Sequence, residues 1–299
     1  MTLLVLTALA GESVAVTGGG HVKTFLSASF PYEHLYMASP DCENLLEWED
    51  CIEASGQGIG DLRLWAEART ERFTFKAHHS TSMLAPGTQT SSLGASGVGL
   101  QPPELVKLSW SATDDPGLAL RGRADRLSVG LSIPHVDVTL GRQPVTFGRA
   151  FFFTPLDLVS PFNPTVVDQE YKPGIDALRL DGYWGMSGQV TAVAAWAGQP
   201  GPTWEDDAEE PDLEDAVFAF YGQGTVGVWD LGLFAGLVRK DRVLGLSTSG
   251  SIRVIGVRLE GAGTLPADED EDPFFRAVAG ADWFATDKLM LSGEVYVQS

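Results

Sequence analysis

Two adjacent histidines, His78 and His79, are the residues whose types best suit chemistry, because Ser80 and Ser82 follow closely in the chain. A histidine that removes the proton from a serine hydroxyl forms the base and nucleophile pair of a hydrolase. The sequence marks neither a third residue that would orient the histidine nor an oxyanion hole. We therefore predict that the chain is not an enzyme and needs no cofactor.

The two cysteines, Cys42 and Cys51, lie within the segment DCENLLEWEDC. There is no C-x-x-C spacing and no nearby pair of histidines, so a zinc-type metal site is not indicated. In an exported protein, we expect the two thiols to form one disulfide that closes a small loop. Two unrelated free thiols are the alternative.

The net charge of −20 arises from 40 acidic and 20 basic residues. Three segments without lysine or arginine carry the excess, at residues 31–58, 198–215 and 262–273, and the rest of the chain is neutral. A net basic face is missing, which disfavours nucleic-acid binding. Carboxylates at Asp268, Asp270 and Asp272 could bind Ca²⁺ or Mg²⁺ weakly. Their spacing does not match an EF-hand, and a solvated acidic loop is the alternative.

The elements that must position these side chains are β-strands. Apolar and polar residues alternate with a period of two, as where Leu127, Val129 and Leu131 alternate with Ser128 and Gly130. No run reaches the ~18 consecutive apolar residues of a membrane helix, and few windows have the spacing of an amphipathic helix. The pattern predicts an all-β protein with about 13 strands.

Three features favour a transmembrane, antiparallel, up-and-down β-barrel over a soluble β-sandwich or a propeller. The polar face carries opposite charges and glycines, as expected of a wet barrel interior. The longer strands have about 9–11 residues, enough to cross a bilayer when tilted. Short connections alternate with mostly long ones, as in outer-membrane barrels, and all three acidic segments fall on the long side. The short connections are expected at residues 70–71, 134–135, 185–188, 223–224, 247–251 and 285–287.

The two ends of the chain suggest processing and truncation. Residues 1–10 are apolar and end in Ala8-Leu9-Ala10, which resembles a signal-peptide cleavage pattern. A first β-strand is the alternative for this segment. The last residues, EVYVQS, stop inside a strand pattern, so we expect a C-terminal truncation of one barrel domain at residues 20–299. The full barrel would have about 14–18 strands, because bacterial barrels usually have even numbers.

The polar face combines basic and acidic residues in similar numbers, which predicts a hydrated lumen, because burying so many ions in a dry interior would be very costly. For any single residue, pairing across adjacent strands is the simpler interpretation. The candidate pore-lining residues are Arg142, Arg149, Asp157, Arg179, Asp181, Arg63, Arg69 and Arg126.

The connection at residues 148–174 is long and unusually apolar, with Phe151, Phe152 and Phe153 in succession. Such a segment must pack on something, so we expect it to fold into the barrel and narrow it. Arg142, Arg149, Asp157 and Arg179 would line this constriction. Val145 and Phe147 have the wrong parity to face lipid, and a β-bulge near Gly141 and Arg142 would correct this and swing Arg142 inward.

Around this connection the chain reads LGRQPVTFG, then TPLDLVSPFNP, then YKPGIDALRL. These stretches resemble a group of Gram-negative outer-membrane porin-like barrels that includes the alginate-export and related long-barrel porin families. The shared pattern is a strand ending in Gly-Arg-Gln, a glycine, a loop with a Pro/Asp/Pro pattern, and a strand that begins near glycine. The matching positions are Gly141, Arg142, Gln143, Gly148, Pro155, Asp157, Pro161, Pro164 and Gly174. Family members commonly have a tryptophan where Phe147 stands.

The resemblance implies passive passage of small polar or charged solutes through the outer membrane of a Gram-negative bacterium. The implied partners are the lipid bilayer, lipopolysaccharide and the solutes, and the barrel could form a homo-oligomer. The alternative function is a barrel without a channel, an adhesin or structural anchor that acts through its acidic external loops.

Overall fold

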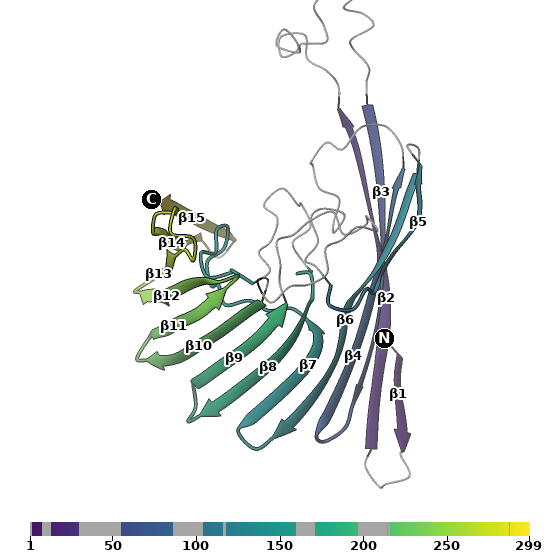
Figure 1. The fold of residues 1–299 in the computed structure, drawn as a ribbon, viewed down its shortest axis with the longest axis horizontal. Coiled ribbons are helices and arrows are strands. Elements are labelled where there is room, and N and C mark those ends of the chain that lie inside the picture. Colours follow the sequence, from purple (N-terminus) through teal and green to yellow (C-terminus); the bar gives the residue numbers. More distant parts are fainter. Residues whose placement is uncertain are drawn as a thin grey trace, which may run out of the picture.

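The computed structural model describes residues 2–7, 13–29, 55–85, 104–115, 118–159, 171–196, 214, 216–286 and 288–299. Over these residues, the chain forms one antiparallel sheet of 15 strands (Figure 1). The strands are β1 (Thr2–Thr7), β2 (Ser13–Ser29), β3 (Ser55–Arg69), β4 (Phe73–Ala85), β5 (Ser109–Asp115), β6 (Leu118–Ile133), β7 (Val136–Gln143), β8 (Ile175–Trp184), β9 (Gly188–Trp196), β10 (Ala216–Val226), β11 (Trp229–Val238), β12 (Asp241–Ile252), β13 (Ile255–Leu265), β14 (Phe274–Thr286) and β15 (Leu289–Gln298).

The topology is up-and-down, because strands that are neighbours in the chain are also neighbours in the sheet. The exception is β5, which pairs only with the first part of β6 and lies outside the main path, so that β4 pairs directly with β6. This short hairpin and β1 account for the two strands beyond the expected number. Among the described residues the sheet is open, with β1 and β15 at its edges.

Short turns join the strands at one end of the sheet, called the short-turn edge here, and mostly long connections join them at the opposite end, as the sequence predicts. Two of the expected short connections are misplaced: strands β10 and β12 run through residues 223–224 and 247–251, and their turns follow at 227–228 and 253–254. On the opposite edge, Arg239 and Lys240 form a two-residue turn with positive φ values of 53° and 75°. The glycine and serine residues at these positions therefore belong to strands of the sheet, which is called the wall here, and do not mark turns.

The outer face of the sheet is apolar and exposed. Its exposed side chains come from alternate positions of successive strands and include Leu178, Leu180, Phe218, Phe220, Leu231, Leu233, Leu244, Leu246 and Leu259. A β-sandwich would cover one such face with a second sheet, and the described residues form only one sheet. The soluble sandwich is thus not the fold.

No helix among the described residues is long and apolar enough to cross a membrane. Residues 2–7 lie in β1, which pairs with β2. The signal peptide remains a prediction from the sequence.

The prediction of a β-bulge near Gly141 and Arg142 is wrong. Strand β7 pairs with β6 and β8 without a register shift as far as Gln143. Instead, Gly141 has a φ of +113°, and beyond it the Arg142 side chain is buried on the inner face, although its partner Leu127 is exposed on the outer face. The register shift lies in the pairing of β4 with β6, where Asp125 is the extra residue.

Replacing Gly141 by alanine should destabilise the protein by about 1–3 kcal/mol, because alanine is strained at this φ. A Cβ atom at this position would lie 2.3 Å from the carbonyl oxygen of Leu127. The free energy of unfolding in urea, measured on protein refolded in detergent, tests this. Gly263→Ala in β13 is the control, since nothing lies within 4 Å of its Cβ position. Equal effects of the two substitutions would contradict the prediction.

Candidate functional site

Residues 144–159, called the inner segment here, pack against the inner face of the sheet. Val145, Phe147, Leu156 and Val159 are buried in one apolar cluster. The cluster also contains wall residues from β8 to β13, namely Ile175, Ala177, Val193, Ala195, Val217, Ala219, Tyr221, Phe234, Val238, Val243 and Ala262. Val145 and Phe147 are therefore buried inside the curve of the sheet, which corrects the expectation that they face lipid.

The wall is shaped to receive this segment. The Phe147 ring centroid lies 5.5 Å from that of Tyr221 and 5.3 Å from that of Phe234. Gly245 of β12 leaves room for Leu156, because a Cβ atom at this glycine would lie 2.1 Å from a methyl carbon of Leu156. The inner segment thus fits a recess made by a glycine in the wall.

Two glutamates of the wall hold the backbone of the inner segment. The Glu260 carboxylate on β13 accepts hydrogen bonds from the N–H groups of Arg149 (2.7 Å), Ala150 (3.2 Å) and Leu156 (2.7 Å). The Glu294 carboxylate on β15 accepts from the N–H groups of the three phenylalanines that follow, at 2.6, 2.8 and 3.4 Å. A segment without secondary structure needs other acceptors for its N–H groups, and these two carboxylates accept six hydrogen bonds from it.

An ion pair within the long connection adds to this anchoring. The ammonium of Lys172 contacts the carboxylate of Asp157, and both side chains are buried. Burial raises the pKa of Asp157 and lowers that of Lys172, while their mutual attraction acts in the opposite direction on each. The pair joins residue 157 to residue 172, across a stretch that lies partly outside the described residues.

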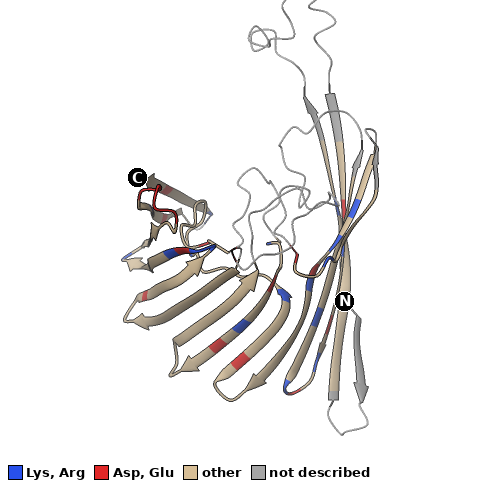
Figure 2. Cartoon of the chain, viewed as in Figure 1, with Lys and Arg blue, Asp and Glu red and all other residues tan. Residues whose placement is uncertain are grey.

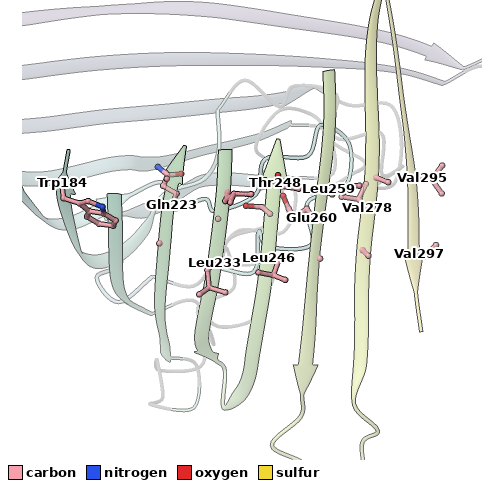
Figure 3. A pocket seen from close by; sticks show the side chains of 18 residues that line it. Trp184, Gln223, Leu233, Leu246, Thr248, Leu259, Glu260, Val278, Val295 and Val297 are labelled. Carbon is pink, nitrogen blue, oxygen red and sulfur yellow. The ribbon is translucent and has the colours of Figure 1, made fainter. Parts of the chain in front are cut away.

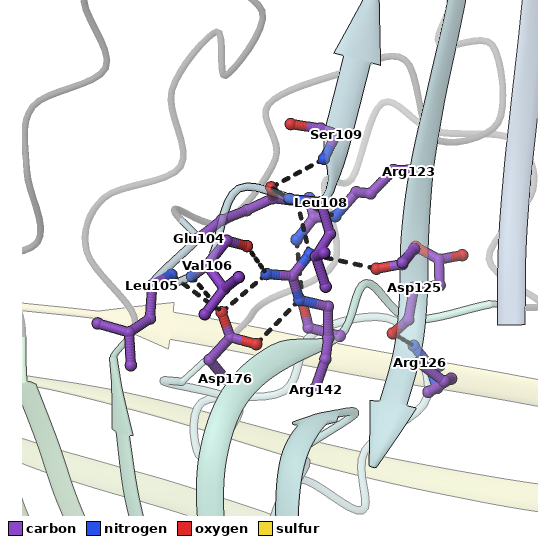
Figure 4. A network of polar contacts seen from close by, with 12 residues as sticks. Glu104, Leu105, Val106, Leu108, Ser109, Arg123, Asp125, Arg126, Arg142 and Asp176 are labelled. Carbon is purple, nitrogen blue, oxygen red and sulfur yellow. Dashed lines mark hydrogen bonds and ion pairs between the residues drawn. The ribbon is translucent and has the colours of Figure 1, made fainter. Parts of the chain in front are cut away.

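Arg142 is the centre of a second, larger network (Figure 4). Its Nε and Nη2 atoms donate to the two carboxylate oxygens of Asp176 at 3.0 and 2.7 Å, and Nη1 donates to Glu104 at 2.8 Å. The remaining two donors reach the carbonyl oxygens of Ala124 and Val106. All five donors of the guanidinium are therefore used, and the side chain is only 1% exposed.

The same network fixes the segment before β5. Asp176 accepts hydrogen bonds from the N–H groups of Leu105 and Val106, and Glu104 accepts from those of Leu108 and Ser109. Arg123 of β6 pairs with Glu104 at 3.1 Å. Strands β6, β7 and β8 and the segment before β5 are thereby joined through charged groups that are largely buried.

Polar side chains of β8, β9 and β10 form a continuous row of hydrogen bonds that reaches Arg149 of the inner segment. Asp181 binds Arg179 at 2.7 Å and Gln189 at 3.0 Å, and Gln189 accepts from Gln223 at 2.6 Å. Gln223 in turn accepts from Arg149 at 2.5 Å. The charge pair in this row, Arg179 with Asp181, lies within β8, and the row continues to β9 and β10 through the neutral side chains of Gln189 and Gln223.

Two polar cavities lie along the inner face. One, of about 410 Å³, is bordered by β3, β4, β6, β7 and β8 and contains Arg69, Lys76, Arg126, Arg179 and Asp181 among its lining residues. The other, of about 680 Å³, lies between the inner segment, the turn at Arg239 and the connection from β13 to β14. Figure 2 shows basic residues on β4 and β6 and both signs on β7 and β8. Solutes moving along this face would meet charges of both signs.

The structure places the eight predicted pore-lining residues in two groups. Those that are buried in ion pairs are Arg63 (with Asp125), Arg142, Asp157 and Asp181. Those that keep some exposure or border the cavity of β3–β8 are Arg69, Arg126, Arg149 and Arg179. Pore lining remains a prediction for all eight.

Cys42 and Cys51 lie outside the described residues. Asp268, Asp270 and Asp272 lie in the connection from β13 to β14, where an oxygen of Asp268 accepts the N–H of Asp270 at 3.0 Å. The described part of the chain contains no group of three or more His, Cys, Asp or Glu residues placed to hold a metal ion.

Glu104, Lys172 and Asp176 could not be predicted from the sequence, because each of their ion pairs joins residues 15 or more positions apart. Glu260 and Glu294 were recognisable only as inward carboxylates, from their parity among the apolar residues of β13 and β15. The local sequence does not show that these two carboxylates bind the inner segment.

The outer face has a large apolar depression of about 990 Å³ across β8 to β15 (Figure 3). Leu233, Leu246, Leu259, Val295 and Val297 border it, and small residues such as Ala277 and Ala279 lie between them. Trp184, Trp229 and Trp283 are near the ends of their strands at the short-turn edge. This face has the composition of a lipid-facing surface with an aromatic girdle.

A single up-and-down antiparallel sheet, apolar outside and charged inside with a segment folded against its inner wall, defines a porin-like transmembrane β-barrel. The solved structures it resembles are outer-membrane porins. No protein-family model matches the chain, and no curated protein matches it.

Three solved structures illustrate the likeness. Pseudomonas aeruginosa OccK9 (OpdG) matches with a TM-score of 0.53 and 12% identity over 95% of this chain and 67% of that one. Acinetobacter baumannii OccAB1 has a TM-score of 0.50 at 9% identity, covering 94% of this chain and 65% of that one. Acinetobacter baumannii OccAB4 has a TM-score of 0.47 at 10% identity, covering 91% of this chain and 64% of that one. The chain thus spans about two thirds of their lengths, and identities this low show the fold alone.

Proposed function

We propose that the protein is a channel for passive diffusion of small polar or charged solutes across the outer membrane of a Gram-negative bacterium. The observation that carries this proposal is the contrast between the two faces of one sheet. The outer face is apolar with exposed large side chains, and the inner face has paired charges beside polar cavities. A channel with this wall needs no catalytic group, because the solute moves down its own gradient.

The bilayer and lipopolysaccharide are the proposed surroundings of the outer face. Hydrocarbon would fill its apolar depression, and the tryptophans at the short-turn edge would lie at one membrane interface. Homo-oligomers could form through the same face.

The inner segment supports a constriction as part of this proposal. Its apolar side chains pack into the inner face of the sheet, and its backbone is held there by Glu260. The side chain of Arg149 is 25% exposed and that of Arg179 is 30% exposed. We expect these two arginines to meet passing solutes, and fixed charge near a narrow point selects among them.

Planar-bilayer recording tests the proposal. We expect the full chain, refolded in detergent, to give discrete single-channel current steps, and the detergent alone to give none. Protein that inserts into vesicles with its β content intact but produces no steps would overturn the channel. It would favour the non-channel adhesin or anchor.

A further inference from the structure

Phe151, Phe152 and Phe153 differ from every other apolar residue of the inner segment that packs on the wall. They are 65%, 61% and 49% exposed, whereas the segment's residues in the apolar cluster are nearly inaccessible. Exposing large aromatic side chains to water is unfavourable by roughly 25 cal/mol per Å² of apolar surface. Three exposed phenylalanines in succession on the inner side of the sheet therefore indicate a binding site for a ligand that has an apolar surface.

The three rings are held in a fixed arrangement. All three backbone N–H groups donate to the carboxylate of Glu294, whose side chain is only 1% exposed. The rings of Phe151 and Phe152 meet edge to face at 4.8 Å, and the ring of Phe153 lies 5.2 Å from that of Tyr296 on β15. We call Phe151, Phe152, Phe153 and Tyr296 the aromatic platform.

Uncharged hydrogen-bonding groups border the platform. The Tyr296 hydroxyl donates to the side-chain oxygen of Gln298 at 2.8 Å, which leaves the Gln298 amide N–H₂ group exposed. The nearby cation, Arg258, is already paired with Asp282 and Glu294. Arg276 on β14 lies directly opposite Gln298 and adds a cation beside the platform. A solute with an apolar face and hydroxyl groups therefore finds both rings and hydrogen-bonding partners here.

We propose that the aromatic platform binds the pyranose rings of sugars as they pass the constriction. The C–H face of a pyranose ring is weakly apolar and packs against aromatic rings, while its hydroxyl groups require polar partners at the ring edge. The platform supplies the first, and Tyr296 with Gln298 supplies the second. This inference rests on the proposed channel and names a solute class for it.

Maltotriose added to one side of a planar bilayer tests the proposal. In the wild-type channel, we expect transient interruptions of the current, and sorbitol, which has hydroxyl groups but no ring, should cause none. Phe152→Leu keeps an apolar side chain but removes the ring, so it should shorten the sugar's residence time roughly tenfold.

The matched control is Phe220→Leu, because Phe220 is equally exposed, at 60%, but lies on the outer face. It should leave the interruptions unchanged. A conducting wild-type channel that maltotriose does not interrupt would overturn the proposal, and interruption by benzoate in its place would identify an aromatic solute. No interruption by either compound would overturn it as well.

A second measurement keeps the sugar proposal separate from the channel itself. Saturation-transfer NMR of maltotriose with the refolded protein in detergent reports binding whether or not current steps occur. We expect saturation transfer in the wild type and in Phe220→Leu, and a clear reduction in Phe152→Leu. Current steps without saturation transfer would sink only the sugar site, while saturation transfer without steps would sink only the channel.

Discussion

Replacing Arg142 by methionine should destabilise the protein by about 3–5 kcal/mol, the cost of removing one partner from a buried ion pair. Methionine is similar in length but donates no hydrogen bond. The Asp176 carboxylate and the carbonyl oxygens of Ala124 and Val106 would lose their guanidinium donors. Glu104 would retain Arg123 as its cation. The segment before β5 should become accessible to proteases, because Asp176, which binds the N–H groups of Leu105 and Val106, would no longer be held in place.

Urea unfolding of the refolded protein, followed by tryptophan fluorescence, measures the effect. Arg69→Met is the matched control, since Arg69 is an exposed arginine on the same wall, and it should change the free energy of unfolding by less than about 1 kcal/mol. Arg142→Lys keeps the charge but cannot replace the planar five-donor group, so it should fall between the two. If Arg142→Met were no more destabilising than Arg69→Met, the network would contribute nothing to stability.

Replacing Glu260 by glutamine should release the inner segment and raise the single-channel conductance. Glutamine keeps the shape of the side chain but turns one of its two acceptor oxygens into a donor. That donor would face an N–H group of Leu156 or of Arg149 and Ala150. Hydrogen bonds to a charged acceptor are worth roughly 1.5–3 kcal/mol each, so the segment should also fluctuate more and add noise to the open-channel current.

Glu67→Gln on β3 is the matched control, because Glu67 is also an inward carboxylate but contacts His78 of the wall and not the inner segment. Its conductance and current noise should match the wild type. Wild-type conductance and noise in Glu260→Gln would show that the apolar cluster alone holds the inner segment in position.

The alternation of side chains between two faces could be predicted from the sequence, because the period of a strand is local. Strand ends were harder to place. Gly224 and Ser249 were taken for turn residues, but they continue strands, opposite Leu231 and Asp230 of β11. The five hydrogen bonds of Arg142 were out of reach, because they depend on Glu104 and Asp176, each more than 30 residues away.

The position of Val145 and Phe147 shows why parity alone misled the sequence analysis. Parity assumes that every apolar residue seeks lipid, whereas these two pack on an inner wall that is itself apolar where the segment lies. The wall residues concerned, such as Val193 and Val217, have the inward parity that elsewhere belongs to polar side chains. A wall that changes from polar to apolar along its inner face is visible only when the segment that covers it is in place.

The anchoring of the inner segment by Glu260 and Glu294 also bears on the order in which the protein is built. The strands of the wall pair with their neighbours in sequence, so most of their contacts form locally. The segment's hydrogen bonds instead close loops of 111 residues to Glu260 and 143 residues to Glu294, and such long-range contacts form late in folding. A nascent sheet that ends before β13 would contain the segment without its acceptors. The passage would therefore acquire its narrow point only once β13 and β15 had joined the sheet.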